Sequence, residues 1–462
     1  MLFNSAVFLL LFLPIAYGVF WLLRTAQSRY VWLTLSGYVF YGYWDVRFCL
    51  LMAFSTLVSY FAGLGFLRWQ DARRRKLCLV LPITADLMLL GYFKYANFGL
   101  DTARQIAEWV GADVSLPYLN IILPVGISFY TFHTITYIVD SYRRVVTPTR
   151  NLFEFSAYVS LFSQLVAGPI VRFRQVEKDL EAIGNAKQSR WLYQGISLFI
   201  VGMVEKVVIA DSLAAFVDPA LASYQTLSTG GAWLAMLGYS CQLYFDFSGY
   251  STMAVGLGYM FGIRIPQNFN SPYKALDPSD FWRRWHISLS TCMRDYLYIP
   301  FGGNRGTESQ TTRNLMFTML IGGLWHGAAW TFVIWGAYHG ILLVIYRRIA
   351  PFWDALHVWV RRPAMWFFVV IGWVFFRATD FSMATSLLGK MLIPTSGVTV
   401  PALPLALTVL GVASIWATLG PNPLEMRHEP RFRNRVALAT AFGVCFAIIM
   451  GLRHSPFLYF QF

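Results

Sequence analysis

Residues 314–346 read NLMFTMLIGGLWHGAAWTFVIWGAYHGILLVIY and contain no Asp, Glu, Lys or Arg. A membrane-spanning helix needs about 20 mainly apolar residues, so this stretch predicts two spans or one broken span. His326 and His339 lie within it. An ionisable side chain at membrane depth is costly to bury, so both histidines are candidate functional residues. The alternative for either one is a neutral core histidine that bonds a neighbouring helix.

The whole chain has the composition of a membrane protein. Of its 462 residues, 57% are hydrophobic and only 13% are charged, against about 25% in an average soluble domain. So few charges cannot cover soluble domains of this total size, and the surplus apolar surface must face lipid. Further apolar stretches lie near 7–23, 30–44, 48–67, 77–93, 121–139, 152–171, 191–210, 231–262, 364–376, 402–419 and 436–452. They predict an all-α polytopic membrane protein with about a dozen crossings, as a single integral-membrane domain over residues 1–462.

Basic residues form short clusters between the apolar stretches. Lys and Arg total 37 against 23 Asp and Glu, and the clusters lie at 73–76, 143–144, 347–348, 361–362 and 427–435. This placement follows the positive-inside rule for cytoplasmic loops and argues against nucleic-acid binding. It predicts that residues 436–462 form the last helix and a tail on the outer face. Arg172 and Arg174 fit the alternation poorly, which predicts a re-entrant element near 152–175.

Motifs of several soluble enzyme classes are missing from the sequence. Its five cysteines include no C-x-x-C pair, so neither a disulfide framework nor a metal site is expected. No G-x-G-x-x-G, Walker loop or H-E-x-x-H occurs, so the sequence has none of the motifs expected for hydride transfer, nucleotide hydrolysis or zinc proteolysis.

The most polar long segment covers residues 264–313 and includes QNFNSPYKALDPSDFWRRWHISLSTCMRDYLYIPFGGNRG. It is too polar to span a membrane and too aromatic for a flexible linker. Aromatic rings at headgroup depth with cations toward water suit an interfacial platform. The cations concerned are Lys274, Arg283, Arg284 and Arg294. The alternative is an amphipathic helix that only seals the cytoplasmic face.

His286, in this polar segment, is the expected neighbour of His326. The turn-forming residues 302–306, GGNRG, lie between the two, and antiparallel flanking segments would bring both imidazoles to similar depth. An imidazole can take a proton from a hydroxyl that attacks a carbonyl, so the pair suits general-base catalysis. His339 would lie about 20 Å from His326 on a continuous helix, too far to share one centre. Glycines near His326 would let a bulky substrate approach the backbone; they are Gly322, Gly323 and Gly327.

Two stretches carry a family resemblance. FWRRWHISLSTCMRDYLYIPFGGNRG at 281–306 and GGLWHGAAWTFVIWGAYHG at 322–340 resemble the signature of the membrane-bound O-acyltransferase (MBOAT) superfamily, in its bacterial polysaccharide branch. Other segments that resemble this branch are FLLLFLP at 8–14, GYFKYANFG at 91–99, LPVGISFYTF at 123–132, LVAGPIVRF at 165–173, QLYFDFSGYS at 242–251 and FLYFQF at 457–462. The resemblance covers nearly the whole chain, in order.

The resemblance implies a ring of tilted helices around a tunnel in the bacterial inner membrane. It implies that His326 is the catalytic residue and His286 its partner, with Trp325, Gly327 and His339 lining the tunnel. The implied donor is cytoplasmic acetyl-CoA, a co-substrate and not a bound cofactor. Its phosphates would contact the cations Lys274, Arg283, Arg284 and Arg294.

The implied acceptor is an exopolysaccharide, such as alginate or cellulose. Related enzymes act on peptidoglycan or D-alanylate teichoic acids, so those alternatives stay open. The chain has no G-x-S-x-G nucleophile elbow around Ser248. A periplasmic hydrolase-like O-acetyltransferase is therefore expected as a separate partner, which makes contact with the polysaccharide indirect.

The tail SPFLYFQF, residues 455–462, is expected to relay the acetyl group through Tyr459. The tail would lie on the outer face, which a cytoplasmic donor cannot reach. A phenol has a pKa of about 10, below that of a sugar alcohol, so its aryl ester can pass the acyl group onward. The tail also resembles the acyl-accepting terminal motif of small partners in teichoic acid D-alanylation. The alternative is an aromatic belt that only anchors the chain end.

A rival interpretation is a transporter whose buried histidines relay protons with Asp86 and Asp246. Two features count against it: polar residues gather in one block near 264–340, and no inverted repeat is visible. The sequence by itself assigns no role to Asp86, His133 or Asp246.

Overall fold

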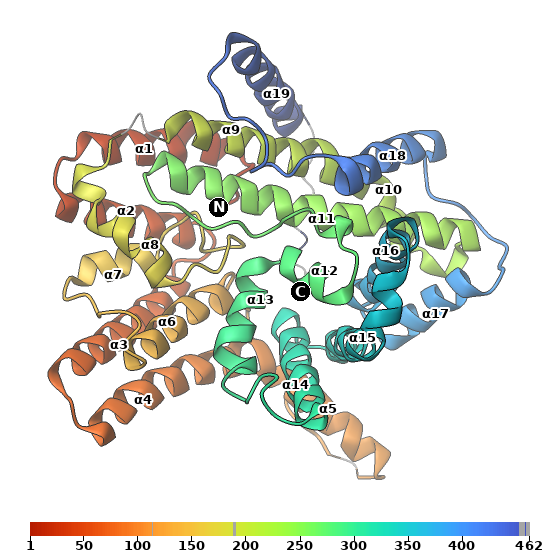
Figure 1. The fold of residues 1–462 in the computed structure, drawn as a ribbon, viewed down its shortest axis with the longest axis horizontal. Coiled ribbons are helices and arrows are strands. Elements are labelled where there is room, and N and C mark those ends of the chain that lie inside the picture. Colours follow the sequence, from red (N-terminus) through yellow and green to blue (C-terminus); the bar gives the residue numbers. More distant parts are fainter. Residues whose placement is uncertain (113, 188–190, 452–457, 459–462) are drawn as a thin grey trace. The chain divides into compact units, whose positions relative to one another are not determined.

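The computed structural model describes residues 1–112, 114–187, 191–451 and 458. Over these residues the chain consists of helices joined by turns and loops (Figure 1). The described residues form no sheet, only an isolated bridge between Leu227 and Val398. The predicted all-α fold is confirmed.

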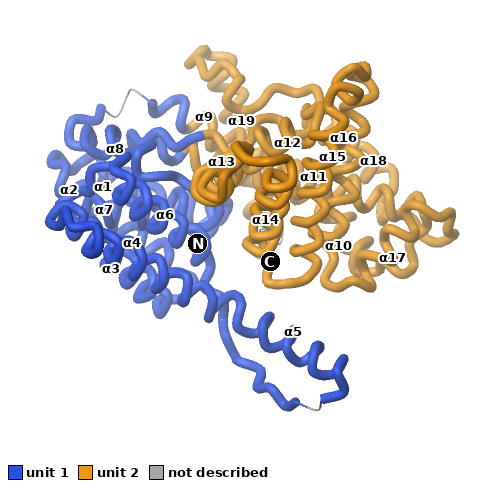
Figure 2. Tube along the Cα trace, turned by 60° about the horizontal axis from the view of Figure 1, so that its bottom comes forward, with its two compact units in different colours: residues 1–195, 257–266 blue, residues 196–256, 267–462 orange. Residues whose placement is uncertain are grey.

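The chain forms two compact units (Figure 2). Unit 1 contains residues 1–195 and 257–266, and unit 2 contains residues 196–256 and 267–462. The chain therefore enters unit 2, returns to unit 1 and enters unit 2 again. That residues 1–462 act as a single integral-membrane domain stays a prediction.

Unit 1 consists mainly of the N-terminal helices. They are η1 (Phe8–Phe12), α1 (Leu13–Leu22), α2 (Ala26–Gly42), α3 (Phe48–Arg68), α4 (Ala72–Leu90), η2 (Gly91–Tyr95), α5 (Ala96–Trp109), α6 (Ile127–Tyr142), α7 (Leu152–Val159), α8 (Phe173–Glu181) and η3 (Ile183–Asn185). Helices α3, α4 and α6 contact one another, and α2 packs against α7. Helix α5 projects away from the other helices of this unit (Figures 1 and 2).

A buried stretch without helix follows α7. Residues 160–172 contain no helix, yet every one of them is buried. At membrane depth, irregular backbone is tolerated only where protein or a water-filled cavity shields it. This stretch falls within the region near 152–175 for which a re-entrant element is predicted.

The core of unit 1 is completed by residues from much later in the chain. Helix α11 (Thr229–Met260) ends in this unit, and the ring of Phe261 lies 5.8 Å from Tyr17 and 5.1 Å from Phe20. The indole of Trp21 donates to the carbonyl of Met260 at 3.2 Å. Phe261 also packs edge-on against Phe162, at 5.4 Å.

Unit 2 contains the remaining helices. They are most of α9 (Leu192–Met203), η5 (Val204–Ala210), α10 (Asp211–Ala222), η6 (Tyr224–Thr226), most of α11, η7 (Pro272–Lys274), α12 (Pro278–Arg284), α13 (Ile287–Met293), η8 (Arg294–Tyr298), α14 (Glu308–His326), α15 (Trp330–Ala355), α16 (Val358–Arg377), α17 (Phe381–Leu392), α18 (Leu403–Leu419) and α19 (Phe432–Gly451). Helix α15 contacts α14, α16 and α12. The region 314–346 is therefore two helices, as one of the two sequence interpretations predicted.

Polar side chains fix where two helices near the site begin. The carboxylate of Asp277 accepts the amide of Asp280 at the start of α12 (2.7 Å). The hydroxyl of Thr307 accepts the amide of Gln310 at the start of α14 (3.3 Å). Each such cap satisfies a backbone donor that the helix cannot, and is worth about 1 kcal/mol.

Among the described residues, five helices are long and apolar enough to cross a membrane. They are Phe48–Arg68, Ala72–Trp109, Trp330–Ala355, Val358–Arg377 and Phe432–Gly451, and shorter apolar helices cover Phe8–Leu22 and Leu403–Leu419. The other predicted crossings fall on helices that are shorter or more polar. The chain is a multi-pass membrane protein, and the full count of crossings stays a prediction.

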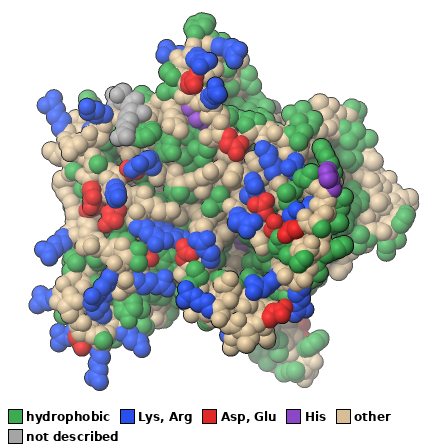
Figure 3. Space-filling view, in the orientation of Figure 1, with side chains coloured by type: hydrophobic (Ala, Val, Ile, Leu, Met, Phe, Trp, Pro, Cys, Tyr) green, Lys and Arg blue, Asp and Glu red, His purple; other side chains and the backbone are tan. Residues whose placement is uncertain are grey.

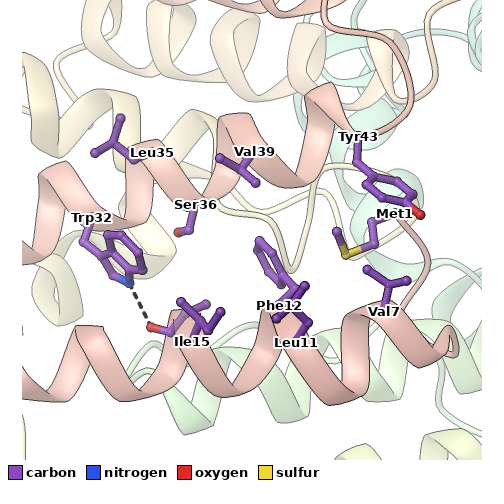
Figure 4. A pocket seen from close by; sticks show the side chains of 11 residues that line it. Met1, Val7, Leu11, Phe12, Ile15, Trp32, Leu35, Ser36, Val39 and Tyr43 are labelled. Atoms are coloured by element: carbon purple, nitrogen blue, oxygen red, sulfur yellow. Dashed lines mark hydrogen bonds between the residues drawn. The ribbon is translucent and has the colours of Figure 1, made fainter.

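Unit 1 contains an apolar cavity of about 320 Å³ between its first helices (Figure 4). Side chains from η1, α1 and α2 line it, and the indole of Trp32 donates to the carbonyl of Ala16 at 2.8 Å. Apart from Ser36 and Tyr43, no polar side chain lines it among the described residues. The cavity therefore offers no group suited to acyl-transfer chemistry.

Candidate functional site

His286 lies at the corner between the short helices α12 and α13. Its backbone has φ 44° and ψ 53°, the left-handed region, which costs a non-glycine residue about 1–2 kcal/mol. Asn268 holds the corner, because its carbonyl accepts the amide of Ile287 at 2.8 Å. Its side-chain oxygen lies 3.2 Å from Nδ1 of His286. Burial lowers the pKa of His286 to about 3, so the imidazole is neutral at physiological pH.

His326 is the last residue of α14, directly before the break that separates α14 from α15. Its ring lies 5.0 Å from Trp325, 5.0 Å from Trp335 and 5.4 Å from Phe376. The side chain is 4% exposed. The aromatic rings therefore hold His326 in a buried pocket of unit 2.

The two imidazoles meet, as the sequence predicts. The ring centroids of His286 and His326 are 6.2 Å apart, and the planes are inclined at 61°. Trp325 packs against both rings, at 6.0 Å from His286 and 5.0 Å from His326. The glycines of the 302–306 stretch reverse the chain between them, since Gly302 and Gly303 have φ of 111° and 56°.

The predicted separation of His339 from His326 is wrong. It assumed a continuous helix, but α14 ends at His326 and α15 begins at Trp330. Helix α15 runs back along α14, so that Gly336 faces Met319 and Gly340 faces Met316. As a result both imidazoles lie against the same indole, Trp335, at 5.0 Å for His326 and 4.9 Å for His339.

Two of the three glycines near His326 serve helix packing instead of substrate access. A Cβ on Gly323 would lie 2.3 Å from the carbonyl oxygen of Phe332, and one on Gly327 would lie 2.1 Å from the Phe332 ring. Of these three glycines, only Gly322 has no atom of the described residues within 4 Å of an added Cβ. The prediction of an open approach to the backbone therefore fails for Gly323 and Gly327.

The cations predicted to contact the donor are mostly engaged within the protein. Lys274 donates to the carbonyl of Gly420 at 2.6 Å, and Arg284 pairs with Asp280 at 3.0 Å. The side chains of Arg283 and Arg294 are 66% and 58% exposed. Both also pair with acidic neighbours, Arg283 with Asp280 at 3.7 Å and Arg294 with Asp295 at 2.7 Å, so each of the four cations has a partner within the protein.

A buried charge cluster in unit 2 was not predicted from the sequence. Nζ of Lys206 lies 2.5 Å from Asp246 and 2.7 Å from Asp211, and Lys206 and Asp246 are almost wholly buried. The amide of Leu458 donates to the second oxygen of Asp246 at 2.9 Å. Leu458 is itself buried, whereas Tyr459 lies outside the described residues.

Asp86 lies in unit 1, and each of its carboxylate oxygens accepts a hydrogen bond from a hydroxyl group. Its carboxylate accepts Ser55 at 2.6 Å and Thr134 at 2.7 Å. His133 is buried next to Thr134 in the chain, and neither of its ring nitrogens has a hydrogen-bond partner among the described residues. Asp86 and Asp246 thus each have their own local partners, which gives no support to a relay through them.

Fold and site together define a multi-pass helical membrane protein with two buried, adjoining imidazoles in an aromatic pocket. A model of the MBOAT, membrane-bound O-acyltransferase, family matches residues 127–385, which include His286 and His326. The chain belongs to this family and is therefore an O-acyltransferase. This assignment sets the transporter interpretation aside.

Several curated proteins are similar over most of the chain. A protein named "Probable alginate O-acetylase AlgI" from Azotobacter vinelandii is 47% identical over 85% of this chain and 78% of its own length. One of the same name from Pseudomonas putida is 40% identical over the full length of both chains. A "Peptidoglycan O-acetyltransferase" from Helicobacter pylori is 38% identical over 85% of this chain and 80% of its own length.

Proposed function

We propose that this protein takes acetyl from cytoplasmic acetyl-CoA and passes it outward for O-acetylation of an exopolysaccharide, with alginate as the first candidate. The observation that carries the proposal is the contact between the buried rings of His286 and His326. The similarity to proteins named as alginate O-acetylases supports the choice of acyl group and polymer. The peptidoglycan enzyme is also similar, so peptidoglycan is the second candidate acceptor.

His326 acts as the general base in this proposal. It removes the proton of an attacking hydroxyl while the hydroxyl oxygen bonds to the thioester carbon. The C–S bond then breaks, and the imidazolium returns the proton to the leaving thiolate, giving an ester and the free thiol. His286 supports His326 at the same centre.

Tyr459 is the proposed first acceptor, and its aryl ester then passes acetyl to an outer acceptor hydroxyl, which restores the phenol. The amide of its chain neighbour Leu458 donates to the carboxylate of Asp246 at 2.9 Å, and this contact supports the proposal. The second transfer involves a separate periplasmic hydrolase-like O-acetyltransferase, which acts on the polymer.

The donor enters from the cytoplasm of a bacterium, at its inner membrane. Basic side chains are numerous on the face shown in Figure 3, as expected for a face that follows the positive-inside rule. Arg283 and Arg294 are exposed and can contact the phosphates of the donor. Lys274 and Arg284 belong to the same polar segment, residues 264–313, and bond within the protein.

The test is His326→Ala and His326→Gln in protein that is confirmed to be inserted in the membrane. Loss of a general base lowers the rate about 10²- to 10⁴-fold, so polymer acetylation from acetyl-CoA should fall by that much. His357→Ala is the control, because this exposed imidazole only caps α16. Near-normal acetylation by the His326 variants would remove this residue from catalysis.

A further inference from the structure

Asn268 forms hydrogen bonds with the corner that carries His286, through both its backbone and its side chain. Its carbonyl accepts the amide of Ile287 at 2.8 Å. Its side-chain oxygen Oδ1 lies 3.2 Å from the amide of Ser288, 2.8 Å from the Ser288 hydroxyl and 3.2 Å from Nδ1 of His286. Asn268 is 2% exposed. One buried residue, 18 positions before His286 in the chain, therefore accepts the hydrogen bonds of this corner.

The orientation of the Asn268 amide is determined by its neighbours. The amide of Ser288 can only donate, so the atom that faces it must be an oxygen. On the other side, Nδ2 of Asn268 donates to the hydroxyl of Ser251 at 3.1 Å. The same oxygen meets Nδ1 of His286 at 3.2 Å. The Ser288 hydroxyl also lies 3.4 Å from Nδ1, but it donates its proton to the Asn268 oxygen at 2.8 Å, so Nδ1 carries the proton in the neutral ring.

This proton placement leaves Nε2 of His286 with a free lone pair. Nε2 is buried and has no hydrogen-bond partner among the described residues. The rings packed on His286 include Phe247, Trp325, His326 and Phe269, with centroids 4.8, 6.0, 6.2 and 6.3 Å from the His286 centroid. His326 is the ionisable side chain among these four. Nε2 is thus available to accept a hydrogen bond at the centre of the site.

We propose that Asn268 is a positioning residue for acyl transfer, which fixes His286 as its Nδ1–H tautomer and so presents the Nε2 lone pair at the site. This inference rests on the proposed function of the two histidines. The other tautomer would place a proton on Nε2 and point a lone pair at the oxygen of Asn268, which is repulsive. Asn268 removes that tautomer without adding a charge.

The experiment compares Asn268→Ala with Asn268→Asp in membrane-reconstituted protein, with acetyl-CoA as donor and release of free CoA thiol as readout. We expect Asn268→Ala to lower kcat about 10- to 100-fold with little change in the KM for acetyl-CoA, because His286 loses the orientation in which it supports the base His326, while the donor contacts stay unchanged. Asn268→Asp keeps an acceptor for Nδ1–H and should recover much of kcat.

The pH profile separates positioning from a merely structural role. In Asn268→Asp a carboxylate faces the imidazole and stabilises its protonated form, which raises the pKa of His286. His286 must be neutral to keep its Nε2 lone pair, so the acid limb of kcat/KM should move to higher pH. Asn422→Ala is the matched control. Asn422 is also buried, at 3% exposed, and donates to the carbonyl of Phe269 at 2.9 Å without contacting His286. It should keep the wild-type profile.

Two results would overturn the proposal: wild-type kcat in Asn268→Ala, or a profile of Asn268→Asp that overlays the wild type. If Asn268→Ala does not insert, the profile of Asn268→Asp decides alone. Failure here is distinct from failure of the proposed function. A wild-type rate in His286→Gln would dismiss the histidine itself, whereas an active Asn268→Ala beside an inactive His286→Gln dismisses only the positioning role.

Discussion

At the residue scale, the contact between His286 and His326 predicts that the two act as one unit. Groups that act together lose their effect together, so the loss in the double variant should be close to that of the worse single variant. We expect His286→Gln and His326→Gln each to depress acetyl transfer, and the combination to add little. The measurement is kcat for the two single variants and the double variant, at saturating acetyl-CoA.

Losses that multiply would instead show that the two imidazoles serve separate steps. The amount of membrane-inserted protein must be equal in all samples, because His286 lies at a strained corner whose replacement also changes stability. His326 is at a helix end with ordinary backbone geometry, so its variant is the cleaner of the two.

Two site residues, His286 and His326, could be found from the sequence, since each is an ionisable group beside a recognisable motif. Their meeting could also be predicted, because a glycine-rich turn lies between them. Asn268 could not be found, because its importance comes from one side-chain oxygen shared among three donors. The pairing of Lys206 with Asp246 was missed for a similar reason, since the two residues are 40 positions apart in the chain and leave no local pattern.

At the element scale, the hairpin of α14 and α15 predicts different outcomes for two adjacent glycines. Gly323 faces the backbone of α15, where a Cβ would lie 2.3 Å from a carbonyl oxygen, whereas Gly322 has open space among the described residues. We expect Gly323→Ala to lower both the thermal midpoint in detergent and the activity. Gly322→Ala should leave the midpoint unchanged or raise it, because alanine favours helix by up to about 1 kcal/mol over glycine.

Equal midpoints for the two alanine variants would mean that the helices can separate at no cost. The same hairpin shows where prediction by element fails. Hydropathy gave the stretch 314–346 but not the position of its break, because Gly327 to Ala329 are as apolar as their neighbours. The distance assigned to His339 was wrong for that reason.

At the scale of the whole molecule, the proposed function requires acetyl to leave the cytoplasmic side, and the proposed relay assigns this step to Tyr459. We expect Tyr459→Phe, which keeps the ring and removes the hydroxyl, to abolish polymer acetylation while acetyl-CoA binding persists. The measurement is acetate released from polymer by mild base, together with a search by mass spectrometry for acetyl on Tyr459 in the wild type. Tyr118→Phe removes a phenol that is 73% exposed in unit 1 and serves as the control.

Wild-type acetylation by Tyr459→Phe would reduce the tail to an anchor in the interface. Sequence composition was sufficient to predict a helical membrane protein at this scale, since a chain of this length with so few charges must expose apolar surface to lipid. It could not predict the two compact units, because their division follows contacts and not chain order.

The return of Phe261 to the aromatic core of unit 1 has a consequence for how the chain is made. A ribosome exposes the helices of unit 1 first, but the ring that packs between Tyr17, Phe20 and Phe162 arrives only after α9, α10 and α11 have been synthesised. Until then these three rings lack that packing partner. A fragment cut after residue 195 would lack Phe261 altogether, so gene fusions and split versions of this enzyme should keep residues 257–266 with the N-terminal part.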